Sequence, residues 1–250
     1  MVAAGNFFFH LRNGLFPAVF LLIALVLRPA ELLGDARLDR ICMVLGALVI
    51  LAGQFIRFFV IGYAYIRRGG KNRKIHADRL VVKGLYAHAR NPMYFGNILI
   101  AAGFSIYFGS LLMTAVTMAF FGFVYLAITA AEERYLLLKF GPEYEEYTQR
   151  VNRFVPNFRG LSQSLAGHPF QWREALSKEY GTISATAAGL LVVTMWKIVC
   201  VSGWEGARAR VEDLAWAVVP LAAFYVTLRF LKVTGRLTAS KVPNAGRGGV

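Results

Sequence analysis

The 250-residue chain is 57% hydrophobic and only 17% charged, whereas charged residues make up about a quarter of an average soluble domain. This composition excludes an ordinary soluble domain and predicts that a lipid bilayer surrounds much of the chain. The net charge of +14 is in general compatible with nucleic-acid binding, but the basic residues are concentrated beside apolar segments, which indicates membrane-flanking loops and no nucleic-acid partner.

Six apolar stretches along the chain are close to the length that crosses about 30 Å of hydrocarbon. The first is longer than the apolar part of a signal peptide, so we interpret it as a retained helix. The predicted spans cover about residues 14–33, 41–66, 92–108, 111–130, 183–202 and 212–231. The sequence therefore predicts an all-α, polytopic membrane bundle that forms a single domain over residues 1–250.

The Lys and Arg residues are distributed unequally between the two ends of these spans. With the N-terminus inside, the inside segments hold 21 of them and the outside ends hold five. Because cytoplasmic loops carry the excess of basic residues, both termini are predicted to be cytoplasmic. The largest group lies between the second and third spans and consists of Arg67, Arg68, Lys71, Arg73, Lys74, Arg79, Lys83 and Arg90.

The third and fourth spans are separated only by Gly109 and Ser110, which predicts a tight helical hairpin with both open ends in the cytoplasm. Arg90 lies about 20 residues before this turn and Glu132 about 22 residues after it, so at 1.5 Å per residue the two are level to within about 3 to 5 Å. The adjacent carboxylates Glu132 and Glu133 are functional candidates, because ionisable groups at a membrane edge are costly. The simpler alternative is an interfacial ion pair with Arg90 or Arg134.

A second short helix is predicted directly after the hairpin. Gly141 is typical of a helix end and Pro142 of a helix start. Tyr144 and Tyr147 then share one face of this segment. We expect an amphipathic helix that lies against the membrane surface and covers the mouth of the hairpin.

Several polar residues fall within the predicted spans. Gln54 and Arg57 lie one turn apart on one face and should point into the bundle, where they either bind an acceptor headgroup or hydrogen-bond a neighbouring helix. Asn97 is expected to join two helices, and Lys197 to extend its amine toward the outer membrane surface. The four histidines and two cysteines are too scattered to predict a metal site.

Four motifs follow one another within residues 80–158. They are Gly84-Leu85-Tyr86, Arg90-Asn91-Pro92-Met93-Tyr94-Phe95-Gly96, Glu132-Glu133, and Phe140-Gly141-x-x-Tyr144-x-x-Tyr147-x-x-x-Val151-x-Arg153-Phe154-x-Pro156. In order and spacing they resemble the isoprenylcysteine carboxyl methyltransferase and phospholipid methyltransferase superfamily, whose commonest form has histidine where this chain has Asn91. Residues 183–231 lie beyond this methyltransferase core and form a two-helix extension without an interpretable motif.

The resemblance implies a membrane-embedded enzyme that uses S-adenosylmethionine to methylate a lipid-like or lipidated acceptor. Such an enzyme does not use the glycine-rich dinucleotide fold of soluble proteins, and this chain contains no GxGxxG motif after a strand. By analogy the cofactor-binding residues are Tyr86, Arg90, Asn91, Tyr94, Glu132, Glu133, Tyr144, Tyr147 and Arg153. The catalytic candidates are Arg90, Glu133 and His88, with Glu133 or His88 as general base for an amine or thiol acceptor; a carboxylate acceptor needs no base. Gln54 and Arg57 are the candidates for binding the acceptor.

Two other interpretations stay open. Related membrane folds include reductases that use NADPH, and a noncatalytic membrane protein could retain the same fold. The combination of Arg-Asn-Pro with Glu-Glu favours the methyl donor over the nicotinamide cofactor.

Overall fold

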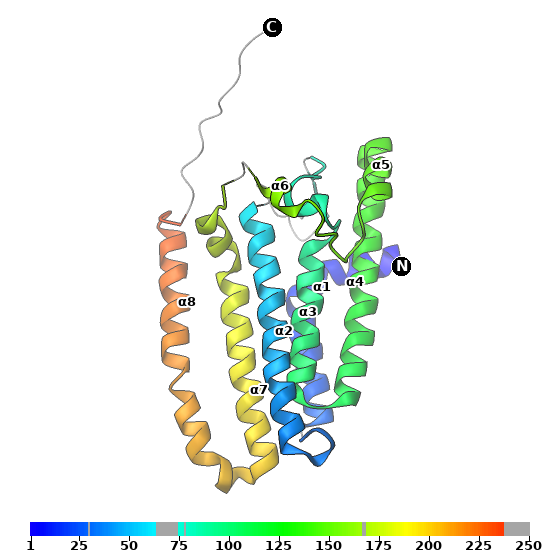
Figure 1. Ribbon diagram of the computed structural model, residues 1–250. Coiled ribbons are helices and arrows are strands. Elements are labelled where there is room, and N and C mark those ends of the chain that lie inside the picture. Colours follow the sequence, from blue (N-terminus) through cyan, green and yellow to red (C-terminus); the bar gives the residue numbers. More distant parts are fainter. Residues whose placement is uncertain (30, 64–74, 78, 167–168, 238–250) are drawn as a thin grey trace.

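The computed structural model describes residues 1–29, 31–63, 75–77, 79–166 and 169–237 (Figure 1). Over these ranges the chain is helical and contains no strand, which confirms the predicted all-α class. The long helices α1 (Val2–Leu27), α2 (Ala36–Tyr63), α3 (Pro92–Phe108), α4 (Leu111–Phe140), α7 (Trp172–Ala215) and α8 (Val218–Val233) form the bundle. The short helices α5 (Pro142–Arg150) and α6 (Leu161–Leu165) lie at one end of it (Figure 1).

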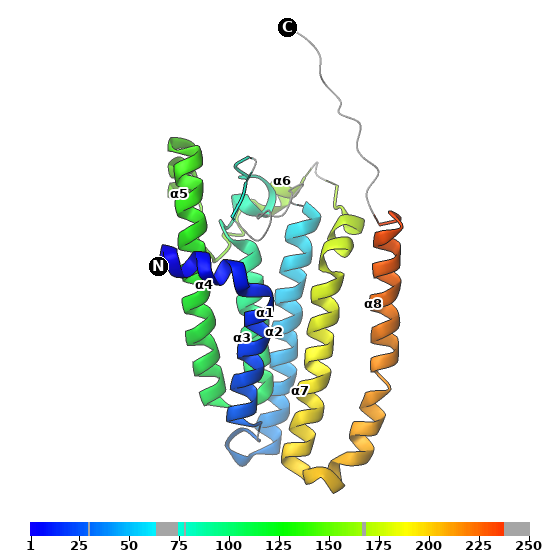
Figure 2. The ribbon, with the colours of Figure 1, turned by 180° about the vertical axis from the view of Figure 1, so that it is seen from behind.

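Four described stretches are long and apolar enough to cross a membrane: Gly14–Gly34, Ala36–Tyr63, Leu111–Phe140 and Trp172–Val233. The apolar helix α3 is shorter, with 17 residues. The last stretch has 62 residues and reverses direction, because Gly203 leaves the helical conformation with φ 68° and ψ 167°. The chain then returns beside α7 as α8 (Figure 2), as the predicted pair of C-terminal spans requires.

Several helix boundaries differ from those of the predicted spans, among them the starts of α1 and α7. α1 begins at Val2, well before residue 14, and its first turns lie across α4 while the rest runs along the bundle (Figure 2). α7 begins at Trp172, about ten residues before the predicted span. Apolar runs identify the part of a helix that fits hydrocarbon, but helices extend beyond it wherever their polar turns find contacts. Arg67, Arg68, Lys71, Arg73 and Lys74 of the predicted basic loop lie outside the described residues.

The turn between α3 and α4 forms as predicted. Gly109 ends α3 in the left-handed conformation at φ 79°, which glycine adopts without a steric cost. Ser110 caps α4, since its Oγ accepts a hydrogen bond from the Met113 amide at 3.2 Å. These two caps make a two-residue connection sufficient, and they bring the ends of α3 and α4 that carry the motifs to the same end of the bundle.

Pairs of glycines set the spacing between α2 and α3. A Cβ atom added at Gly46 would lie 2.6 Å from the carbonyl oxygen of Gly103, and one added at Gly53 would lie 2.6 Å from that of Gly96. The two backbones therefore touch at two levels that are seven residues apart on each helix. Such close contact is typical of membrane helices, where packing rather than water exclusion drives association.

Replacing Gly53 by leucine is expected to force α2 and α3 apart and to lower the free energy of unfolding by about 1–3 kcal/mol, the usual cost of overpacking. Thermal unfolding of the purified protein in one detergent measures the effect. Gly122→Leu is the matched control, because a Cβ at Gly122 meets nothing within 4 Å. Equal melting temperatures for the two variants would contradict the close contact.

A buried ion pair joins α7 to α2 near the α3–α4 turn. Lys197 Nζ lies 2.5 Å from Asp39 Oδ1, and the two side chains are 5% and 8% exposed. The amine also donates to the Tyr107 carbonyl at 3.3 Å. The prediction that Lys197 reaches toward the membrane surface is therefore wrong, because Asp39, just before the predicted second span, supplies a partner inside the bundle.

Candidate functional site

Glu133 lies at the centre of a charged cluster near the mouth of the α3–α4 hairpin. Arg90 Nη1 lies 3.0 Å from Glu133 Oε1, and Arg153 Nη2 lies 2.7 Å from Glu133 Oε2. The Arg153 Nε also donates to Oε1 at 3.1 Å. Arg90 and Glu133 are only 14% and 15% exposed, so water screens this pair weakly. The predicted alignment of the two motifs across the hairpin is thereby confirmed.

Main-chain hydrogen bonds bring Arg153 to this cluster. The Arg90 amide donates to the Asn152 carbonyl at 2.8 Å, and the Asn91 amide donates to the Arg153 carbonyl at 3.0 Å. Farther along, the Asn157 amide donates to the His88 carbonyl at 2.9 Å. The segment after α5 therefore runs beside the segment before α3. The Asn91 side chain adds a hydrogen bond from Nδ2 to the Arg153 carbonyl at 3.1 Å.

Glu132 has different partners from Glu133. The Tyr94 hydroxyl donates to Glu132 Oε1 at 2.8 Å, and the same hydroxyl oxygen accepts a hydrogen bond from Arg12 Nη1 at 3.2 Å. Sequence reasoning did not identify Arg12 as a site residue. Its position as a lone cation before the first apolar stretch was the available signal, but nothing in the sequence connects it to Tyr94.

Three tyrosines adjoin the cluster outside the membrane-spanning helices. Tyr144 is 3% exposed; burial, reinforced by the negative charge of Glu133, raises its pKa to about 12, although Arg90 opposes this shift. Tyr147 donates its hydroxyl proton to the Tyr86 carbonyl at 2.7 Å. Burial also raises the pKa of Tyr147 and of Tyr86. All three phenols are therefore neutral near pH 7.

Part of the chain that carries this cluster is similar to known proteins. Residues 41–143 match the phospholipid methyltransferase family. The chain is also 29% identical over 123 residues to the protein-S-isoprenylcysteine O-methyltransferase of Saccharomyces cerevisiae. Both matches support the superfamily predicted from the motifs. The alignment with the yeast protein covers 47% of the chain and half the length of the yeast protein. No solved structure gives a significant match.

Residues 41–143, which match the phospholipid methyltransferase family and are called the phospholipid methyltransferase region, contain part of the predicted site. Arg90, Asn91, Tyr94, Glu132 and Glu133 lie within residues 41–143. Other members of the cluster lie outside these residues, namely Arg12 before the region and Tyr144, Tyr147 and Arg153 after it. The cluster is thus completed by parts of the chain on both sides of the matched region.

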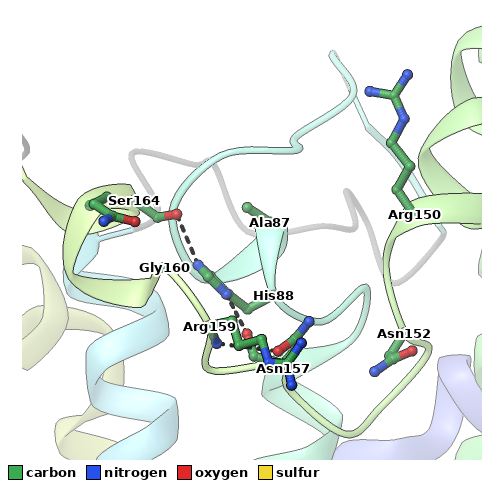
Figure 3. Close-up of a pocket in the computed structure, with 9 residues that line it drawn as sticks. Ala87, His88, Arg150, Asn152, Asn157, Arg159, Gly160 and Ser164 are labelled. Atoms are coloured by element: carbon green, nitrogen blue, oxygen red, sulfur yellow. Dashed lines mark hydrogen bonds between the residues drawn. The ribbon is translucent and has the colours of Figure 1, made fainter.

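His88, also within the phospholipid methyltransferase region, is held by two contacts away from the carboxylates. Its Nδ1 lies 2.5 Å from the Asn157 carbonyl oxygen and its Nε2 lies 2.9 Å from Ser164 Oγ (Figure 3). The ring is buried beside a polar cavity of about 500 Å³ that Arg150 and Arg159 also line. Because both ring nitrogens are engaged, His88 has no free nitrogen to accept a proton, which argues against the predicted role of general base.

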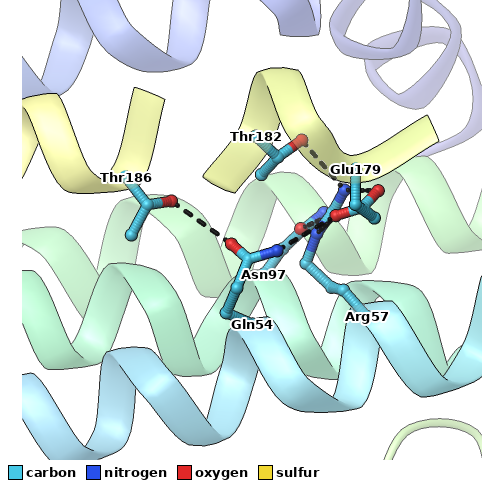
Figure 4. A network of polar contacts seen from close by, with 6 residues as sticks. All are labelled: Gln54, Arg57, Asn97, Glu179, Thr182 and Thr186. Carbon is cyan, nitrogen blue, oxygen red and sulfur yellow. Dashed lines mark hydrogen bonds and ion pairs between the residues drawn. The ribbon is translucent and has the colours of Figure 1, made fainter. Parts of the chain in front are cut away.

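Gln54 and Arg57, the candidates for acceptor binding, belong to a network between α2, α3 and α7 (Figure 4). Arg57 contacts Glu179 through two hydrogen bonds, Nε to Oε2 at 2.8 Å and Nη2 to Oε1 at 2.7 Å, and it also donates to Asn97 Oδ1. Gln54 Nε2 donates to Glu179 Oε2 at 3.2 Å. Glu179 is fully buried. Of the two alternatives for Gln54 and Arg57, these contacts correspond to hydrogen bonding with a neighbouring helix. The contact with Arg57 also confirms that Asn97 joins two helices.

Proposed function

We propose that the chain is an integral membrane methyltransferase that transfers a methyl group from S-adenosylmethionine to a lipid-like or lipidated acceptor. The phospholipid methyltransferase family match and the name of the yeast relative support the reaction class. The observation that carries the proposal is the charged cluster of Arg90, Glu132 and Glu133 where the motif-bearing ends of α3 and α4 meet.

The residues of the cluster fit this donor. The Nε–H of Arg90 is buried and has no hydrogen-bond partner among the described residues, so a ligand that accepts from it would remove the cost of an unmade hydrogen bond. A carboxylate group meets that need with a charge-assisted bond. Glu132 and Glu133 provide the complementary acceptors for an ammonium group or for hydroxyl groups. When bound, S-adenosylmethionine supplies a methyl group on a positively charged sulfur.

The protein groups around the cluster contribute binding, orientation and exclusion of water. Tyr144 is buried beside Arg90 and Glu133, and Tyr147 is fixed to the backbone at Tyr86. Such a site holds two reactants in a productive geometry, which by itself supplies a large part of the rate enhancement in transfer reactions.

The two predicted general bases are both engaged in other contacts. Both carboxylate oxygens of Glu133 are engaged, Oε1 by Arg90 and Arg153 and Oε2 by Arg153. His88 has no free ring nitrogen. This arrangement favours an acceptor that reacts without losing a proton, such as a carboxylate, over an amine or a thiol.

We also propose that the end of the bundle with α5, α6 and the charged cluster faces the cytosol. The last described residues after α8 lie at this same end (Figure 1). The unequal distribution of basic residues supports this orientation. A water-soluble donor and a membrane-soluble acceptor could then reach the cluster from different sides.

Isothermal titration of the purified protein with S-adenosylmethionine and, separately, with NADPH tests the proposed function. We expect the methyl donor alone to bind. Binding of NADPH instead would support a reductase, and binding of neither would support a noncatalytic protein; both outcomes contradict the proposal. Incubation of membranes with donor labelled in its methyl group then identifies the acceptor by the molecule that carries the label.

A further inference from the structure

The N-terminal part of α1 contributes a cation to the candidate site from outside the phospholipid methyltransferase region. We propose that Arg12 is a positioning residue of the donor site, which holds Tyr94 so that Tyr94 in turn orients the Glu132 carboxylate. This inference rests on the proposed function and assigns to the first helix a role in donor binding.

The three groups form a directed chain of hydrogen bonds. Arg12 Nη1 donates to the Tyr94 oxygen at 3.2 Å, and the Tyr94 hydroxyl donates to Glu132 Oε1 at 2.8 Å. A phenol that accepts from a cation becomes a stronger donor, so each bond strengthens the other. The guanidinium also removes the freedom of the hydroxyl to rotate toward another acceptor. Arg12 therefore acts on Glu132 through Tyr94 and not by direct contact.

Close packing of α1 against α4 places Arg12 at this position. A Cβ atom added at Gly5 would lie 2.0 Å from the carbonyl oxygen of Ala127, so the two helices touch there. Phe9 is 3% exposed and packs with Val124 and Ile128. The Arg12 guanidinium carbon lies 3.9 Å from the centre of the Phe9 ring, a cation–π distance. The backbone contact at Gly5, the apolar packing of Phe9 and the contact between the Phe9 ring and the guanidinium together fix the position of Arg12.

The two adjacent carboxylates are oriented in different ways because they have different partners. Glu133 is held directly by Arg90 and Arg153. Glu132 Oε1 accepts a hydrogen bond from Tyr94, and no side chain among the described residues donates to its Oε2, which leaves that oxygen available to a ligand. Of the two, Glu132 is therefore the better partner for a cationic group of the donor, and its orientation depends on the chain that begins at Arg12.

A double-mutant cycle tests the role of Arg12. Isothermal titration of S-adenosylmethionine is carried out on the full-length wild type, Arg12→Leu, Tyr94→Phe and the double variant. We expect Arg12→Leu to weaken donor binding about tenfold, the size of one charge-assisted hydrogen bond, and Arg12→Lys to recover part of the loss. In the Tyr94→Phe background, Arg12→Leu is expected to cause no further loss, because the chain is already broken.

The outcomes separate this inference from the proposed function. If the wild type binds no donor, the function itself is wrong. If the wild type binds and Arg12→Leu binds equally well, only the role of Arg12 is wrong. Equal losses in both backgrounds would show that Arg12 acts without Tyr94 and would also overturn the inference. Melting temperatures of the four proteins, measured without donor, report whether Arg12 and Tyr94 are coupled in the folded protein.

A matched pair of glycine variants tests the same inference without altering any charged group. Gly5→Ala places a Cβ against the Ala127 carbonyl and is expected to displace Arg12, with a loss of donor affinity similar to that of Arg12→Leu. Gly14→Ala lies in the same helix, where an added Cβ meets nothing within 4 Å, and is expected to bind the donor like the wild type. Unchanged affinity in Gly5→Ala would contradict the proposed docking.

Discussion

Replacing Glu133 by glutamine is expected to weaken the binding of S-adenosylmethionine at least about 30-fold, and Arg90→Ala to do the same, because breaking a poorly solvated charge pair costs about 2–5 kcal/mol. Glu133→Gln leaves Arg90 and Arg153 facing an uncharged amide. Arg90→Ala also removes the buried Nε–H that has no hydrogen-bond partner among the described residues. Isothermal titration of each purified variant provides the measurement.

Glu146→Gln is the control for these two variants. Glu146 forms an ion pair with Arg150 on α5, but its side chain is 60% exposed, so its loss is expected to leave donor affinity unchanged. Melting temperatures near that of the wild type show that the variants are folded. Normal affinity in both Glu133→Gln and Arg90→Ala would mean that the donor pocket lies elsewhere.

Replacing Glu179 by leucine is expected to lower the free energy of unfolding by about 3–5 kcal/mol, since it leaves the Arg57 charge buried without its main partner. The Arg57 and Glu179 side chains are 6% and 0% exposed, so water does not compensate the loss. Reversible unfolding in mixed micelles measures the change, and the melting temperature in a single detergent provides a second readout.

Two further variants identify the cause of this destabilisation. Arg57→Met together with Glu179→Leu is expected to recover most of the lost stability, because a buried ion pair can be replaced by apolar groups of similar volume. Glu174→Ala removes an ion pair with Lys178 on the same helix, where the side chains are 31% and 24% exposed, and is expected to change stability by no more than about 1 kcal/mol. A large loss in the double variant would show that the size of the side chain, and not the stranded charge, is responsible.

The sequence predicted those features that depend on local spacing. Two residues between apolar stretches permit only a hairpin, so the turn at Gly109 and Ser110 and the approach of Arg90 to the Glu132-Glu133 pair could both be derived by counting residues. Gly141 and Pro142 likewise fixed the end of α4 and the start of α5. These predictions required no knowledge of how distant helices pack.

Features that depend on packing between distant helices could not be predicted. Lys197 pairs with Asp39 across 158 positions of sequence, and Arg57 pairs with Glu179 across 122. Periodicity shows that such residues share a helix face but does not identify the helix that faces them. Arg12 was missed for the same reason, because its contact with Tyr94 depends on the approach of α1 to α4 at Gly5.

The pairing of the chain around His88 with the chain around Asn157 has a consequence for how this site can vary in evolution. Arg90 and Asn91 are held by their own main-chain amides, which every residue except proline possesses. A change of side chain at position 91 therefore leaves the register of Arg90 and Arg153 intact. With asparagine at position 91, the two arginines converge on Glu133. A substitution at position 91 would lose the hydrogen bond from the Asn91 side chain to the Arg153 carbonyl, but it would keep the main-chain contacts that hold the charged cluster beside it.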